Sequence, residues 1–244
     1  MPVGKLLFSM SLPMIISMLV QAMYNIIDSI FVAQIGEDAL TAVSLAFPVQ
    51  NLMIAVSAGT CVGVNALLSR SLGEKNQKTA DQTAENGLFL AFLSYLAFCL
   101  FGLFGAGVFF QSQTSNTNIV EYGTQYLFIC CTFSFGIFLE MMNERILQST
   151  GRTFYSMITQ GTGAIINIIL DPIMIFGLLG FPAMGVKGAA IATVIGQIFA
   201  MSLSLFIFLT RKFDVKLDLK QFHFSWDTIR RILSVGIPNA CMNA

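Results

Sequence analysis

The chain has 244 residues and no formal net charge; 55% of its residues are hydrophobic and only 11% are charged. A soluble domain is about 25% charged, so this composition and a mean hydropathy of +0.75 exclude a soluble domain. They indicate an all-α protein that crosses a membrane several times. No basic, aromatic-rich patch occurs outside the loops, so lipid is the expected surrounding and nucleic acid is not an expected partner.

Six apolar segments are long enough to cross the bilayer as helices. We expect them at 10–35, 43–68, 86–110, 122–147, 156–179 and 188–210, with a further helix beginning near residue 228. The longest and most charged linker follows the sixth segment. The sequence therefore predicts a six-helix transmembrane lobe over residues 1–210, a cytoplasmic linker over 211–227 and the beginning of a second lobe over 228–244.

The basic residues predict the orientation of these spans. Basic residues concentrate in cytoplasmic loops. With the N-terminus in the cytoplasm, Lys187 is the one basic residue on the outer side, and the other twelve fall on the inner side. We therefore expect a multi-pass protein of the cell membrane (plasma or inner) with a cytoplasmic N-terminus. The twelve are Lys5, Arg70, Lys75, Lys78, Arg145, Arg152, Arg211, Lys212, Lys216, Lys220, Arg230 and Arg231.

Asp28 lies well inside the first span, in Tyr24-Asn-Ile-Ile-Asp28-Ser-Ile-Phe. A carboxylate in the middle of a transmembrane helix costs roughly 2.5–3.5 kcal/mol on insertion scales. One interpretation is a ligand for a proton or cation that faces the bundle interior. The simpler alternative is a carboxylate near the outer end of the helix that reaches the interface or caps the chain.

The fourth span carries Glu140 and Glu144 one helical turn apart, beside Arg145. For Glu140 the simpler interpretation is a local ion pair at the cytoplasmic end of the helix. Arg145 projects from another side of the helix than Glu144, which leaves Glu144 able to face the core. We therefore include Glu144 among the candidate ion-binding or proton-binding residues.

The fifth span contains Asn167 and Asp171, four residues apart and so on one face of a helix. Pro172 lacks the N–H that would bond the carbonyl of Ile168, which leaves a third oxygen free nearby. Three oxygens around one buried point suit a small cation or a proton, although such a polar pair can also serve only to hold helices together. Thr193 in the sixth span is a weaker candidate, because a mid-helix hydroxyl usually bonds its own preceding turn.

A short repeat links the two ends of the chain. Lys5-Leu-Leu-Phe-Ser9-Met-Ser-Leu-Pro13 aligns without gaps on Arg230-Arg-Ile-Leu-Ser234-Val-Gly-Ile-Pro238, a shift of 225 residues. An even number of spans separates the copies, so both begin on the same side of the membrane, as in transporters built from parallel repeats. We infer the first half of a protein about twice this length.

These residues resemble the multidrug and toxic compound extrusion (MATE) family of transporters. The resemblance is closest in three stretches, and the segment around Tyr24 and Asp28 is similar to the acidic motif of the family's first helix. The three stretches are Leu147-Gln-Ser-Thr-Gly151-Arg-Thr, Asn167-Ile-Ile-Leu-Asp171-Pro172 and Met184-Gly185-Val-Lys-Gly188-Ala-Ala-Ile-Ala-Thr193-Val-Ile-Gly-Gln197.

The resemblance implies the first six-helix lobe of a twelve-helix antiporter. Such a protein exports amphipathic, often cationic small molecules, needs the missing C-terminal lobe of the same chain, and uses inward Na⁺ or H⁺ without another cofactor. Its ion site would map onto Asp28, Asn167, Asp171 and Thr193, which would be the metal ligands if the ion is Na⁺. Glu144 and Gln148 stand where many members have an Asn and an Arg, so the choice between Na⁺ and H⁺ stays open.

Three other function classes compete with this hypothesis. A lipid-linked sugar flippase or polysaccharide exporter of related architecture usually needs a large hydrophilic or cationic cavity, whereas Arg145 is the one basic residue inside the spans. A passive channel or a receptor would show no coupling to an ion gradient. An enzyme is not expected, because no Ser-His, HExxH or paired catalytic motif occurs in the spans.

Overall fold

The computed structural model describes residues 3–210 and 224–243, and within these ranges the chain forms helices and no strand. The elements in chain order are α1 (Val3–Ala33), α2 (Glu37–Gly73), α3 (Gln77–Phe104), α4 (Ala106–Gln113), α5 (Thr117–Thr132), α6 (Phe135–Ser149), α7 (Thr153–Phe176), the 3-10 turn η1 (Leu178–Gly180), α8 (Val186–Thr210) and α9 (Trp226–Asn243).

Five of these helices, α1, α2, α3, α7 and α8, are long and apolar enough to cross a membrane. Helices α5 and α6 pass the same test together and meet at an angle of 45°, so the described residues contain up to six spans. The predicted all-α fold with six spans is therefore confirmed, and α9 confirms the helix expected near residue 228.

The fourth predicted span, 122–147, is two helices rather than one. The break falls at Phe133 and Ser134. The hydroxyl of Ser134 donates to the carbonyl of Cys131 at 2.8 Å, and its N–H reaches the same carbonyl at 3.3 Å. A serine that bonds back to its own preceding turn competes with the regular helix ladder and bends the helix. The third predicted span, 86–110, is likewise divided at Gly105 into α3 and α4.

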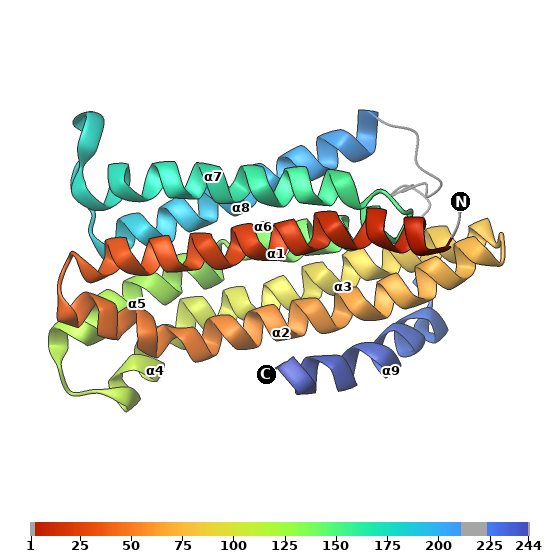
Figure 1. The fold of residues 1–244 in the computed structure, drawn as a ribbon. Coiled ribbons are helices and arrows are strands. Elements are labelled where there is room, and N and C mark those ends of the chain that lie inside the picture. The colour runs from red at the N-terminus through yellow and green to blue at the C-terminus, as the bar shows by residue number, and fades with distance from the viewer. Residues whose placement is uncertain (1–2, 211–223, 244) are drawn as a thin grey trace.

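The long helices lie side by side along one direction (Figure 1). Helix α1 packs on α7 and α7 on α8, whereas α2 contacts α3, α5, α6 and α9. The N-terminus, the α2–α3 and α6–α7 connections and the start of α9 lie at one end of the bundle, and the α1–α2, α4–α5 and α7–α8 connections lie at the other. The orientation predicted from the basic residues requires the same alternation of the connections between the two ends of the bundle. Four of those residues, Arg211, Lys212, Lys216 and Lys220, and most of the predicted linker 211–227 lie outside the described ranges.

Two close helix contacts depend on glycine. A Cβ at Gly188 of α8 would lie 2.5 Å from the carbonyl oxygen of Met174 in α7. A Cβ at Gly63 of α2 would collide with the carbonyl of Ile232 in α9. Small residues let transmembrane helices approach until their backbones touch. The first contact holds α7 and α8 together, and the second holds α9 against α2.

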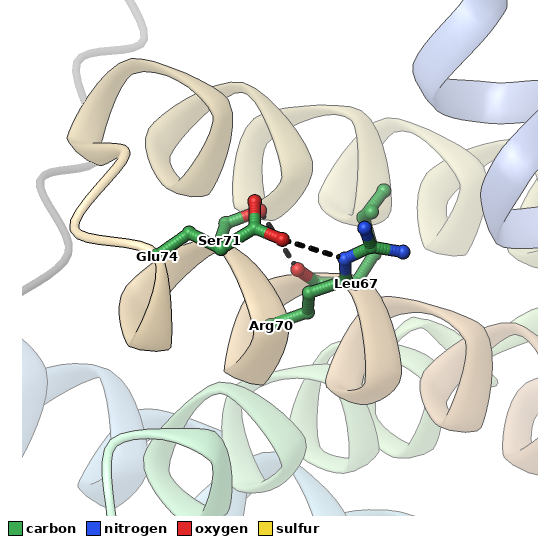
Figure 2. Close-up of polar contacts among 4 residues, drawn as sticks. All are labelled: Leu67, Arg70, Ser71 and Glu74. Carbon is green, nitrogen blue, oxygen red and sulfur yellow. Dashed lines mark hydrogen bonds and ion pairs between the residues drawn. The ribbon is translucent and has the colours of Figure 1, made fainter.

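The end of α2 is stabilised by local polar contacts (Figure 2). Arg70 Nε lies 2.8 Å from Glu74 Oε1, and the hydroxyl of Ser71 donates to the carbonyl of Leu67 at 2.8 Å. Both members of the ion pair are exposed, so water and salt screen their attraction and the pair adds little to stability. These contacts lie at the end of the bundle where most of the described basic residues are found.

Candidate functional site

Asp171 of α7 and Asp28 of α1 face each other inside the bundle. Asp171 has no exposed surface, and the two carboxyl groups lie within hydrogen-bonding reach of one another. Both oxygens of Asp171 and Oδ1 of Asp28 are buried and receive no hydrogen bond from the described residues. Two adjacent carboxylates without donors leave a local excess of negative charge that a proton or cation would relieve.

Asn167 and Thr193 extend this cluster toward α8. Asn167 Nδ2 donates to Thr193 Oγ1 at 3.3 Å, whereas Asn167 Oδ1 is buried and has no donor. The hydroxyl of Tyr24 lies within hydrogen-bonding reach of Thr193. We call Asp28, Asn167, Asp171 and Thr193 the oxygen cluster. The structure thus brings together the four residues that the resemblance assigns to the ion site.

Helix geometry explains this arrangement. Asn167 and Asp171 are one turn apart and project from the same face of α7, toward α1 and α8. Gly196 allows α8 to come close, because a Cβ there would lie 2.8 Å from the carbonyl oxygen of Gly163. Tyr24 precedes Asp28 by one turn on α1, so both point into the same region. That spacing is the signal by which the sequence could have added Tyr24 to the cluster.

The oxygen cluster borders a partly open cavity of about 370 Å³ that is lined by residues of α1, α2, α6, α7 and α8, and we call it the central cavity. Asn167, Thr193 and Tyr24 line it, as do Glu140 and Arg145. A group bound in the cavity therefore lies next to two residues of the cluster. The chemistry of the cluster suits a proton or a hard cation such as Na⁺, because hard cations prefer carboxylate, amide and hydroxyl oxygens.

Glu144 lies apart from the oxygen cluster. Its side chain is 7% exposed and turned toward the first two turns of α7, where Thr159 Oγ1 donates to Oε1 at 3.5 Å and the Ser156 hydroxyl donates to the Glu144 carbonyl at 3.1 Å. Thr159 precedes Asn167 by eight residues, which is about 12 Å along a helix. The prediction that Glu144 faces the core is borne out in its burial, but the geometry does not place its carboxylate with Asp28 and Asp171.

The simpler interpretation of Glu140, an ion pair with Arg145, does not match the geometry. No such pair is present among the described residues, and Arg145 Nη1 instead donates to Gln148 Oε1 at 2.9 Å. Glu140 and Arg145 both line the central cavity. Gln21 and Gln160, which the sequence did not single out, also line it and join α1 to α7 through a hydrogen bond of 3.1 Å.

The model of the MatE family matches residues 13–173 of the chain. The chain belongs to the MATE family of transporters. Among the relatives that this MATE chain matches, a FAD transporter from Shewanella oneidensis is 29% identical over 99% of the chain and 54% of its own length. A probable multidrug resistance protein, NorM, from Thermotoga maritima is 27% identical over 99% of the chain and 52% of its own length. The chain thus spans about half the length of these curated relatives.

Solved structures agree with this family and fold. A MOP superfamily transporter from Pyrococcus furiosus, described as having reversed polarity in its binding pocket, is 30% identical, with a TM-score of 0.90 over 98% of this chain and 52% of that one. An outward-facing multidrug resistance MATE transporter gives the same values. The predicted MATE resemblance is therefore confirmed, and the described fold is that of the N-terminal lobe.

Proposed function

We propose that the chain is the first lobe of a secondary active transporter that exports amphipathic, often cationic, small molecules in exchange for Na⁺ or H⁺. The family supports transport of small molecules rather than catalysis, and relatives such as the multidrug export protein MepA of Staphylococcus aureus support drug export. The single observation that carries ion coupling is the oxygen cluster, in which Asp28, Asn167 and Asp171 have buried oxygens without donors.

The cluster and the cavity together provide a means of exchange. One Na⁺ or H⁺ at Asp28 and Asp171 would offset one of the two facing negative charges, reduce their repulsion and so change how α1 packs on α7. Asn167 and Thr193 belong to both the cluster and the lining of the central cavity, so the same change would alter this cavity, where we propose that the exported molecule binds. One monovalent cation that moves down a potential of 100 mV supplies roughly 2.3 kcal/mol, which corresponds to about a 50-fold gradient of an uncharged substrate.

We propose that the whole protein has a second lobe and a cytoplasmic N-terminus. The shared motif of Lys5–Pro13 and Arg230–Pro238, and relatives of about twice the length, support a second lobe that begins with α9. The domain division is then 1–210, 211–227 and 228–244. The basic residues at one end of the bundle support a cytoplasmic N-terminus in the cell membrane.

A flavin nucleotide is a second candidate substrate. One relative is named a FAD transporter, and FAD carries phosphate groups. Arg145 lines the central cavity and could pair with a phosphate, since guanidinium groups bind phosphate oxygens in a bidentate manner. A lipid-linked sugar is the third candidate and would require a larger hydrophilic surface than the 370 Å³ cavity offers in this lobe.

The experiment uses vesicles that contain the protein expressed from its complete gene. Export of ethidium and of FAD is measured with a Na⁺ gradient, with a pH gradient, and with neither. We expect one gradient to drive export of one substrate, and Asp28→Asn or Asp171→Asn to abolish the coupling. Glu121→Gln, which removes an exposed carboxylate at the start of α5, is the matched control and should transport normally. Coupled export that survives both Asp→Asn variants would refute the site, and flux without any gradient would indicate a channel.

A further inference from the structure

A shallow groove runs along one side of α9, and we call it the α9 groove. Four of its lining residues, from Trp226 to Ile237, follow one another at intervals of one helical turn, so they form a single stripe on the helix. From Arg230 to Pro238 the groove is about 12 Å long, at 1.5 Å per residue. All of its lining residues belong to α9: Trp226, Arg230, Leu233, Ser234, Ile237 and Pro238.

The α9 groove lies beside the face of α9 that packs on α2, not within it. Ile232 and Gly236, which contact α2, are buried. The stripe is turned away from them by roughly a quarter of the helix circumference, since consecutive residues project about 100° apart. Trp226 is 68% exposed and Ile237 is 55% exposed. The described part of the chain therefore leaves the groove uncovered.

The groove is positively charged at one end and apolar along most of its length. Arg230 lies one turn into α9, at the end of the bundle that is predicted to be cytoplasmic, and its side chain forms no ion pair within the described ranges. The nearest carboxylate along the helix, that of Asp227, lies 2.9 Å from Arg231 Nη2. Asp227 thus offsets one of the two arginines, and this part of α9 keeps one positive charge. The hydroxyl of Ser234 donates to the carbonyl of Arg231 at 2.8 Å, so it is not free to donate to a ligand.

We propose that the α9 groove binds an anionic phospholipid of the cytoplasmic leaflet. The guanidinium of Arg230 and the indole N–H of Trp226 donate to the lipid phosphate, since guanidinium groups bind phosphate oxygens in a bidentate manner and tryptophan is enriched at the membrane interface. One acyl chain lies along Leu233 and Ile237, toward the middle of the bilayer. The described lining contains no carboxylate, so the ammonium of a zwitterionic headgroup would have no partner there. Anionic lipids of the cytoplasmic leaflet attract basic residues of this kind.

The internal repeat favours lipid over a protein helix as the occupant of the groove. With the shift of 225 residues, Leu233 and Ile237 of α9 correspond to Phe8 and Leu12 of α1. Phe8 is 68% exposed and Leu12 is 43% exposed, although α1 packs on α7 within its own lobe. A second lobe that folds like the first therefore leaves the same side of α9 open to the bilayer.

Fluorescence quenching by brominated lipids tests this proposal. Trp226 is the one tryptophan of residues 1–244, and any tryptophan of a second lobe is replaced by Phe. The protein expressed from its complete gene is reconstituted in phosphatidylcholine bilayers to which phosphatidylglycerol or phosphatidylcholine with brominated acyl chains is added. We expect brominated phosphatidylglycerol to quench Trp226 with at least about fivefold higher affinity than brominated phosphatidylcholine.

Variants then assign the headgroup contact. Arg230→Gln should remove the preference for phosphatidylglycerol, whereas quenching by phosphatidylcholine should remain and show that the protein is still folded. Arg230→Lys should keep part of the preference. Arg231→Gln is the matched control, because it removes a neighbouring arginine that does not line the groove, and it should keep the preference.

Equal affinity of the unmodified protein for the two lipids overturns the proposal. An equal loss of preference in Arg230→Gln and Arg231→Gln also overturns it, because surface charge alone would then explain the binding. Absence of quenching by either lipid would show that protein covers the groove, which contradicts the proposal as well. Export is not measured in this experiment, so these outcomes are independent of the proposed transport function.

Discussion

Asp171 is the residue on which the proposed ion site depends most. It has no exposed surface, and neither of its carboxylate oxygens has a donor among the described residues. Such a group costs about 1–3 kcal/mol of stability, and more when it is charged. A residue that destabilises the folded lobe in this way is expected where ion binding recovers the cost.

We therefore predict that Asp171→Asn raises the thermal stability of the protein in buffer without Na⁺ at neutral pH, by the equivalent of roughly 1–3 kcal/mol. The neutral amide has the same shape and removes a negative charge that faces Asp28. The stabilisation that added Na⁺ or a lower pH gives the unmodified protein should disappear in the variant, since binding to the folded state is what raises its stability. Thermal unfolding in nanodiscs measures both effects.

Glu121→Gln on the exposed start of α5 is the control for the loss of a carboxylate elsewhere. It should leave the melting temperature and its ion dependence unchanged. A less stable Asp171→Asn variant that still responds to the ion would contradict the assignment.

The sequence could predict only part of this site. Asn167 and Asp171 share a helix face because they are one turn apart, and that follows from spacing alone. Their approach to Asp28, Tyr24 and Thr193 depends on how α7 packs against α1 and α8, which spacing within one helix does not determine. The same holds for Glu144, whose burial was predicted but whose neighbours on α7 were not.

At the scale of helices, glycine determines how closely neighbours pack. The backbone of α9 meets α2 at Gly63, where a Cβ would collide with the carbonyl of Ile232. Ile229 and Ile232 of α9 are 2% and 0% exposed in this contact. The first helix beyond the predicted linker is thus bound to the six-helix lobe by close packing.

We predict that Gly63→Ala forces α9 away from α2 and destabilises the protein by about 1–3 kcal/mol, as overpacking does. Gly161→Ala is the matched control, because that glycine also lies within a helix and a Cβ there meets nothing within 4 Å. It should be neutral or stabilising by up to about 1 kcal/mol. Amide hydrogen exchange should be faster in α9 of the Gly63 variant only. Equal behaviour of the two variants would show that the contact is not close-packed.

The helical type and the number of membrane spans were predictable from the sequence, but the breaks within two of the spans were not. Hydropathy averages over a window, so it joined α5 to α6 and α3 to α4. The break at Ser134 depends on one hydroxyl that bonds back to Cys131. A single side chain of this kind does not change the mean hydropathy of the segment.

At the scale of the whole molecule, the connections alternate between two ends of the bundle (Figure 1). We predict that Lys78→Cys, at the start of α3, is labelled by a membrane-impermeant maleimide only after the cells are opened. Ser115→Cys, between α4 and α5, should be labelled in intact cells. Both native side chains are exposed. The background is the protein in which its five cysteines are replaced by Ala or Ser.

The reverse pattern of labelling would place the basic end of the bundle outside and overturn the predicted orientation. Labelling of both positions in intact cells would show that the bundle does not separate its two ends. Lys187→Cys, at the start of α8 and at the same end as Ser115, repeats the test on a second connection.

The packing of α9 on α2 has a consequence for how the protein could be assembled from pieces. Ile229 and Ile232 are buried where α9 packs on α2 and α3. The chain between residues 210 and 224 therefore only raises the local concentration of two surfaces that already pack together. Two separately translated polypeptides, divided within that interval, should associate in the bilayer and co-purify. Co-purification is expected wherever the second polypeptide begins with an intact α9.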